Sequence, residues 1–92
     1  MSRAILHGRT IKPLVLKEDK RGVPSVSFSL LDQNGKDYHP CFADGNIART
    51  ICRKVKEGEP MIMICDIVST PDSLSMGISS RVAFRVMTFF HG

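Results

Sequence analysis

The 92-residue sequence has no tryptophan, a single tyrosine and only three cysteines. Cys41, Cys52 and Cys65 form no CxxC pair, so neither a disulfide framework nor a zinc site is indicated. Unpaired thiols are typical of a reducing compartment. No apolar run approaches the roughly 18 residues of a membrane-spanning helix, and the run at the start is too short for a signal peptide. The sequence therefore predicts a soluble, cytoplasmic protein without membrane attachment.

The sequence also lacks a basic or acidic tail, because no run of five like charges occurs. Hydrophobic residues make up 42% and charged residues 24%, which are ordinary globular values. We therefore expect one domain over residues 1–92, with a thin core that self-association often completes in so short a chain. The net charge of +4 favours a polyanionic partner, although an ordinary basic protein is the alternative.

Signatures of catalysis and of cofactor binding are missing as well. There is no P-loop, no GxGxxG motif and no pair of carboxylates suited to acid–base work. His39 and Cys41 lie two residues apart, which is weak support for a nucleophilic site. His7 and His39 have no further metal ligand at a suitable spacing. We therefore expect a protein that is not an enzyme and takes no cofactor or metal.

Alternation of apolar and polar residues predicts five strands. The clearest is 25–31, where Val26, Phe28 and Leu30 face one way and serines face the other. We expect Phe28 in the core, and likewise Phe84 in the last strand. The five predicted strands are 3–11 (resuming at 14–16), 25–31, 36–42, 61–68 and 81–90.

Turn and helix signals separate these strands. Asn34–Gly35 predicts a hairpin turn with positive φ at both residues. Gly8 predicts a bulge or a tight bend in the first strand, and Pro40 predicts an edge or a bulge in the third. A helix is predicted after a cap at 44–46, because apolar residues recur at helical spacing, and Gly58 with the following proline should end it. Its apolar stripe is Ile47, Ile51 and Val55, with Arg49, Arg53 and Lys54 on a solvated face.

The resulting order is three strands, one helix and two strands. Strands and helices do not alternate, and no internal repeat occurs. This order predicts an all-β fold, namely a five-stranded Greek-key barrel of the OB type with one α-helix between strands 3 and 4.

In this order the segments resemble the bacterial single-stranded DNA-binding protein family and the related primosomal replication protein. Residues 3–13, with Gly8-Arg9 before a proline, resemble the first strand of that family, and 22–30 resemble its second. Tyr38-His39 stands where the family often has Trp-His, and 56–64 resemble its glycine turn and fourth strand. The chain departs from the family in having no tryptophan, no acidic tail and no Lys or Arg over 69–80. The resemblance implies a short, divergent member.

Binding of single strands needs cations that track phosphates and flat rings that stack on bases. Tyr38 is the best stacking candidate, and Phe42 is a second one, for which the core is the favoured alternative. Arg81 and Arg85 share one face of the last strand, and the other cations lie at the end of the first strand or in the following loop. The full set of predicted nucleic-acid-binding residues is Arg9, Lys12, Lys17, Lys20, Arg21, Tyr38, Phe42, Arg81 and Arg85.

A homodimer or homotetramer is also expected. The resemblance implies a subunit contact for His39. The strand 61–68 is apolar on both faces, so it is either buried on both sides or lies in an interface. Met61 and Met63 are assigned to an expected subunit interface. Phe89 and Phe90 are adjacent, so one of the two rings must point outward if the last strand extends that far.

The sequence thus predicts a non-catalytic protein that binds single-stranded DNA largely without sequence preference, in replication, recombination or a mobile element. RNA is a further ligand that the same barrel type accepts. The alternative is an OB barrel that serves as a protein-interaction or structural subunit with little affinity for nucleic acid, because a fold alone does not decide a function.

Overall fold

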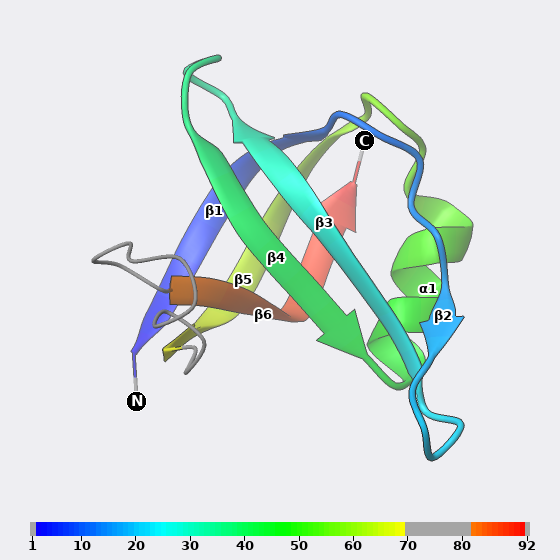
Figure 1. Ribbon diagram of the computed structural model, residues 1–92. Coiled ribbons are helices and arrows are strands. Elements are labelled where there is room, and N and C mark those ends of the chain that lie inside the picture. Colours follow the sequence, from blue (N-terminus) through cyan, green and yellow to red (C-terminus); the bar gives the residue numbers. More distant parts are fainter. Residues whose placement is uncertain (1, 70–81, 92) are drawn as a thin grey trace, which may run out of the picture.

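Five long strands close a barrel in the computed structural model, which describes residues 2–69 and 82–91. The strands follow the order β1–β5–β6–β4–β3, and β3 pairs back to β1 to complete the circle (Figure 1). The predicted order of strands and helix is therefore confirmed. The elements are β1 (Arg3–Thr10), β2 (Lys17–Glu18), β3 (Pro24–Asp32), β4 (Tyr38–Asp44), α1 (Asn46–Lys54), β5 (Pro60–Ser69) and β6 (Val82–His91).

Strand β1 changes partner at Gly8, as the predicted bend requires. It pairs with β5 from Arg3 to Arg9 and with β3 from Gly8 to Thr10, so Gly8 belongs to both ladders. A Cβ atom at this position would collide with the backbone carbonyl oxygen of Leu31 on β3. Only glycine therefore lets the two strands come this close.

Along each strand every second side chain points inward, and these side chains fill the barrel interior. Met61 and Met63 lie in this core, with 1% and 0% of their surface exposed. The prediction that they form a subunit interface is therefore wrong, because a side chain buried within its own chain has no surface left for a partner. The buried apolar set is Leu6, Val26, Leu30, Cys41, Ala43, Ala48, Ile51, Val55, Met61, Met63, Cys65 and Val86.

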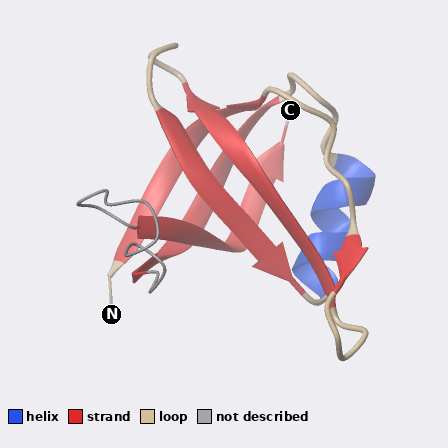
Figure 2. Cartoon of the chain, in the orientation of Figure 1, coloured by secondary structure: helices blue, strands red, loops and turns tan. Residues whose placement is uncertain are grey.

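Helix α1 lies against one side of the barrel and links β4 to β5 (Figure 2). It buries Ala48 and Ile51, as the apolar stripe predicts. Its amino end falls within the predicted cap at 44–46, whereas its carboxyl end differs from the prediction. The cap residue is Gly45, at φ 69°, with no side-chain hydrogen bond, and the helix stops at an extended Val55. Gly58 therefore serves the turn before β5 and does not end the helix.

The loop between β3 and β4 is longer than the predicted two-residue hairpin. Gly35 has a φ of 76°, whereas no non-glycine residue in the described ranges, Asn34 included, has a positive φ. The Gly35 N–H donates to the Asp32 carbonyl, and the Asn34 side chain accepts hydrogen bonds from the backbone N–H groups of Lys36 and Asp37. The Asn34 side chain thus stabilises a wider turn, which replaces the predicted one.

A bulge in the pairing of β5 with β6 decides which of two adjacent rings faces the core. The register shifts between Ile64 and Cys65, so Val86 and Phe89 both point inward despite their odd spacing. Phe89 packs on the core, and Phe90 is 59% exposed. The expectation that one of the two rings points outward is confirmed.

The segment between β1 and β2 does not resume a strand at 14–16 as predicted. Regular pairing returns only at Lys17 and Glu18, which pair with Ser25 and Pro24 of β3. Strand β4 has the predicted edge at Pro40, because in the described residues its pairing with β6 begins at Cys41. Within the same ranges, no helix has the length and apolar character needed to cross a membrane.

Candidate nucleic-acid interface

One outer wall of the barrel, which we call the Tyr38 face, brings together several of the predicted binding residues. It comprises the outward side chains of β3 and β4 and of their paired neighbours in β1, β2 and β6. Directly paired residues point to the same side of a sheet, so the register defines its rows. The rows are Arg9–Leu31–Tyr38, Ser29–Pro40, Ser27–Phe42–Arg85 and Lys17–Ser25–Asp44.

Two aromatic rings stand on the Tyr38 face. Tyr38 is 57% exposed, and Phe42 is half-buried on the same strand. Because they are four residues apart in β4, their Cα atoms lie roughly 13 Å apart along the strand. Tyr38 therefore offers an exposed ring for stacking, and Phe42 offers a partly exposed one.

Three exposed cations accompany these rings. Arg9 lies in the row of Tyr38, separated from it by Leu31. Arg85 pairs directly with Phe42, and Lys17 pairs with Ser25 at the far end of the face. The structure therefore places Arg9, Lys17, Tyr38, Phe42 and Arg85 on one wall, with positive charge on both sides of the rings.

The remaining predicted cations lie elsewhere. Lys20 and Arg21 occupy the turn between β2 and β3, where Asp19 accepts hydrogen bonds from two backbone N–H groups and lies 3.7 Å from the Arg21 guanidinium. The hydrogen bond from the Val23 N–H is the main cause of the lowered pKa of Asp19. Lys12 is exposed in the segment between β1 and β2. Arg81 lies outside the described residues.

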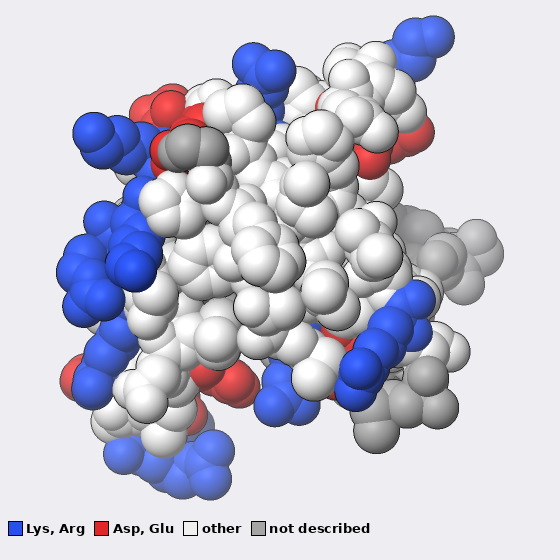
Figure 3. All heavy atoms as spheres, turned by 180° about the vertical axis from the view of Figure 1, so that it is seen from behind, with Lys and Arg blue, Asp and Glu red and all other residues white. Residues whose placement is uncertain are grey.

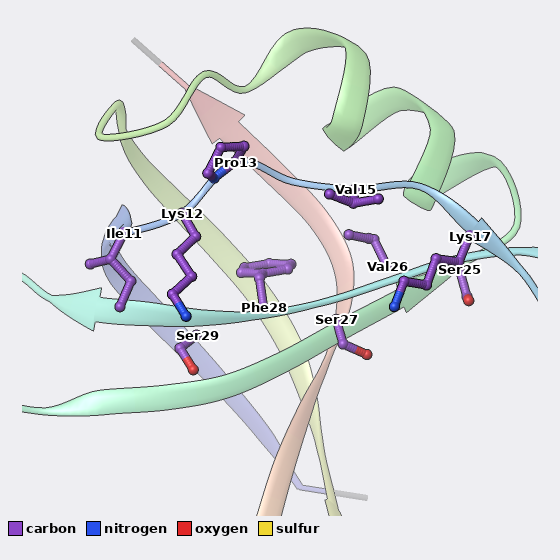
Figure 4. Close-up of a pocket in the computed structure, with 10 residues that line it drawn as sticks. All are labelled: Ile11, Lys12, Pro13, Val15, Lys17, Ser25, Val26, Ser27, Phe28 and Ser29. Carbon is purple, nitrogen blue, oxygen red and sulfur yellow. The ribbon is translucent and has the colours of Figure 1, made fainter.

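A cleft of about 560 Å³ borders the Tyr38 face and was not foreseen from the sequence. The segment from Ile11 to Lys17 forms one side of it, and five consecutive residues of β3 form the other (Figure 4). Phe28 lines this cleft and is only half-buried, so its predicted place in the core is only partly correct. Pro13, which interrupts the ladder, is the signal in the sequence that could have indicated an opening. The lining residues are Ile11, Lys12, Pro13, Val15, Lys17, Ser25, Val26, Ser27, Phe28 and Ser29.

His39 points toward the inside of the barrel and makes contacts within its own chain. Its Nε2 lies 3.0 Å from Oδ1 of Asp32, and its ring meets Phe84 edge-on with 5.5 Å between centroids. The pKa of Asp32 is lowered, first by the N–H of Asn34 and then by the bond to His39. His39 therefore braces the β3–β4 hairpin, and its subunit contact stays a prediction.

The pair of His39 and Cys41 is not arranged for nucleophilic chemistry. The Cys41 thiol donates to the backbone carbonyl of His39, at 3.3 Å, and not to the imidazole. Burial raises the pKa of Cys41 to about 12 and that of Cys65 to about 11, so both thiols stay protonated at neutral pH. Residues 2–69 and 82–91 contain no group of three or more His, Cys, Asp or Glu side chains placed to hold a metal.

The opposite wall of the barrel, which we call the Ile face, is apolar. Ile5 and Ile64 are directly paired, and so are Ile62 and Phe90, with Ile5 73% exposed. Figure 3 shows this back side as a broad surface without Lys, Arg, Asp or Glu, framed by charges at its margins. An exposed apolar patch of this kind is a feature of interaction surfaces.

Comparison with known proteins gives structural matches only. No family model matches the sequence, and no curated protein does so. The SSB domain of a Synechococcus protein superposes with a TM-score of 0.82 at 10% identity, covering 99% of this chain and 96% of that one. The second single-stranded DNA-binding protein of Mycobacterium smegmatis gives 0.77 at 14% identity, covering 98% and 87%. The mitochondrial single-stranded DNA-binding protein of S. cerevisiae gives 0.74 at 10% identity, covering 99% and 93%.

These matches run over almost the whole of each chain, while few residues are identical. What is shared is the path of the backbone: a closed barrel of five strands with one helix between the third and fourth long strands. The fold class predicted from the sequence is confirmed. The chain has the OB fold, in the form found in single-stranded DNA-binding domains.

Proposed function

We propose that the protein binds single-stranded DNA without catalysis and largely without sequence preference. The observation that carries this proposal is the Tyr38 face, where two open rings and three cations share one wall of the barrel. Rings supply stacking that every base accepts, and cations neutralise phosphates, so the wall favours strands without reading their sequence. The fold shared with single-stranded DNA-binding domains supports the same ligand.

The test is a fluorescence-anisotropy titration of the whole chain with a labelled oligo-dT at low and at high salt. Binding should weaken steeply as salt rises, because each phosphate neutralised on a single strand adds about 0.7 to the slope of log K against log salt. A folded protein that leaves oligo-dT free even at low salt would overturn the proposal. An oligo-U titration under the same conditions tells whether RNA is an equal ligand.

We also infer that the chain self-associates through the Ile face, as a homodimer or homotetramer. A surface that carries Ile5 and Phe90 largely exposed is costly to leave in water, and a second copy would present the same uncharged patch. The replacement Ile5→Lys should shift the protein toward monomers in size-exclusion chromatography with light scattering. An unchanged mass for this variant, or a monomeric wild type, would rule out this interface.

A second candidate function is that of an interaction subunit, and the Ile face favours it. In that case the apolar wall would bind another protein and the Tyr38 face would contribute little. Failure of oligo-dT binding, together with a monomeric wild type, would support this alternative. The proposed role in replication, recombination or a mobile element depends on binding of single-stranded DNA, and it is retained only if that binding is found. The three unpaired cysteines agree with a reducing, cytoplasmic location.

A further inference from the structure

A gap in the barrel wall creates the cleft beside β3. Strand β3 pairs with β2 at Pro24 and Ser25 and with β1 from Leu30 onward, so residues 26–29 meet neither strand on that edge. Pro13 has no N–H to donate and a fixed φ, which prevents the chain after β1 from continuing the ladder. Residues 11–17, which we call the arch, curve away from β3 and leave a space of about 560 Å³. That volume lies within the range of sites for small organic molecules.

The floor of the cleft contains a flat apolar ring. Phe28 rises from β3 toward Pro13, and the arch does not cover it completely (Figure 4). The residue of β4 that pairs with Phe28 is Cys41, which is buried, so the Phe28 ring lies at the boundary between core and solvent. A half-covered ring in this position offers one face for stacking on a planar group.

The rim of the cleft is cationic. Lys12 and Lys17 are exposed, and both side chains extend from the arch toward β3 (Figure 4). Three serines of β3 are also lining residues, but their hydroxyls point to the side of β3 away from Phe28 (Figure 4), and no Asp or Glu is among the lining residues. Lysine ammonium groups contact phosphate oxygens, so the rim favours an anion.

We propose that this cleft binds one nucleotide, with the base on Phe28 and a phosphate held between Lys12 and Lys17. A planar group and an anion together describe a nucleotide better than inorganic phosphate alone. The inference rests on the proposed function and deepens it, because Ser27 lies in one row with Phe42. A single DNA strand whose base stacks on Phe42 would reach the cleft by crossing over β3. A free mononucleotide has the same chemistry and is the second source of ligand.

The experiment compares two variants with two matched controls, using oligo-dT and dTMP as probes. Phe28→Leu keeps apolar volume but removes the flat ring, and Phe84→Leu does the same for a half-buried ring that does not line the cleft. The double variant K12Q/K17Q removes the rim charges, and K54Q/K56Q removes two exposed lysines near the end of the helix.

We expect Phe28→Leu to bind oligo-dT roughly tenfold more weakly than Phe84→Leu. We expect K12Q/K17Q, but not K54Q/K56Q, to lower the salt slope by about 1.4. Circular dichroism checks that each variant is folded. If Phe28→Leu does not fold, the single variant Lys12→Gln decides, because Lys12 is exposed and lies outside the Tyr38 face.

The two probes separate the possible outcomes. Loss of oligo-dT affinity in both variants supports a cleft that takes one nucleotide of a strand. Saturable dTMP binding that both variants lose supports a site for free mononucleotides, even if the wild type ignores oligo-dT and the proposed function fails. Wild-type binding of oligo-dT that neither variant weakens beyond its control, with no dTMP binding, overturns the cleft and leaves the proposed function intact.

Discussion

The two walls of this barrel enclose the same core but present different chemistry to solvent. The Tyr38 face carries serines, open rings and cations, whereas the Ile face carries isoleucines and Phe90. Arg85, on the first wall, is paired with Asp66, and Asp66 lies 3.6 Å from Arg3 on the second, so charged residues mark the border. Both walls cover one interior, so their outward positions are free to differ. The difference supports the proposal of a polar ligand on one side and an apolar partner on the other.

The largest effect should come from Gly8, the residue that pairs with both β3 and β5. Gly8→Val would push a branched side chain against the backbone of Leu31 and should cost about 3 kcal/mol of unfolding free energy, at the upper end for overpacked sites. Chemical denaturation measures this loss. Thr88→Val places the same β-branched side chain at an exposed β6 position, in place of a threonine of nearly equal volume, and should change stability little. Equal stability of the two variants would show that β1 does not need the close approach.

Removal of one exposed ring from each wall tests whether the two walls have separate functions. Tyr38 and Phe90 are 57% and 59% exposed, so their alanine variants remove similar rings from opposite walls. Tyr38→Ala should weaken oligo-dT binding by about 1–3 kcal/mol, the usual loss for one stacked base. Phe90→Ala should spare that affinity and lower the molar mass in light scattering. Equal losses of DNA affinity in both variants would mean that both walls contribute to DNA binding.

A smaller effect is expected from the arginine beside Phe42. Arg85→Gln should reduce the salt slope of oligo-dT binding by about 0.7, the contribution of one phosphate contact on a single strand. Arg53→Gln, on the exposed side of α1, serves as the matched control and should keep the wild-type slope. Anisotropy titrations over a series of salt concentrations measure both. A slope that falls only in the Arg53→Gln variant would indicate that the DNA passes over α1 and not over the Tyr38 face.

The smallest effect concerns the hairpin that carries Tyr38. The folded pKa of Asp32 lies below its ordinary value of 3.8, so its bonds to Asn34 and His39 stabilise the fold above that pH. This contribution is lost as the pH falls through the lowered pKa. Asp32→Asn should therefore be less stable than wild type at neutral pH, and in urea unfolding the difference should shrink as the pH falls below 3.8 and through the lowered pKa. A difference that stays the same from neutral to acid pH would mean that the charge of Asp32 is irrelevant.

The strands and the helix were predictable because their signals are local. Val26, Phe28 and Leu30 alternate with serines whatever the rest of the chain does, and the observed strand exceeds the predicted one by a single residue at each end. Most of the Tyr38 face follows from the same alternation. Tyr38 and Phe42 are four apart on one strand and must share a side once that strand forms.

The errors arose where distant segments decide the outcome. Strand β5 is apolar on both sides, so alternation could not tell that Met61 faces the core and Ile62 faces solvent. That choice depends on pairing with β1 and β6. The cleft also escaped prediction, because it exists only where the arch after Pro13 passes over Phe28. In each case the missing information was a tertiary contact.

The shared position of Gly8 also has a consequence for the order of folding. The β3–β4 hairpin joins neighbours in sequence, so it can form early, whereas Gly8 must wait for Met61 before the barrel closes. Barrels dominated by such distant pairings fold in milliseconds to seconds, more slowly than helical domains of similar size. On the ribosome β1 is made before the other strands of the barrel, and it finds its last partner only after β5 has been synthesised.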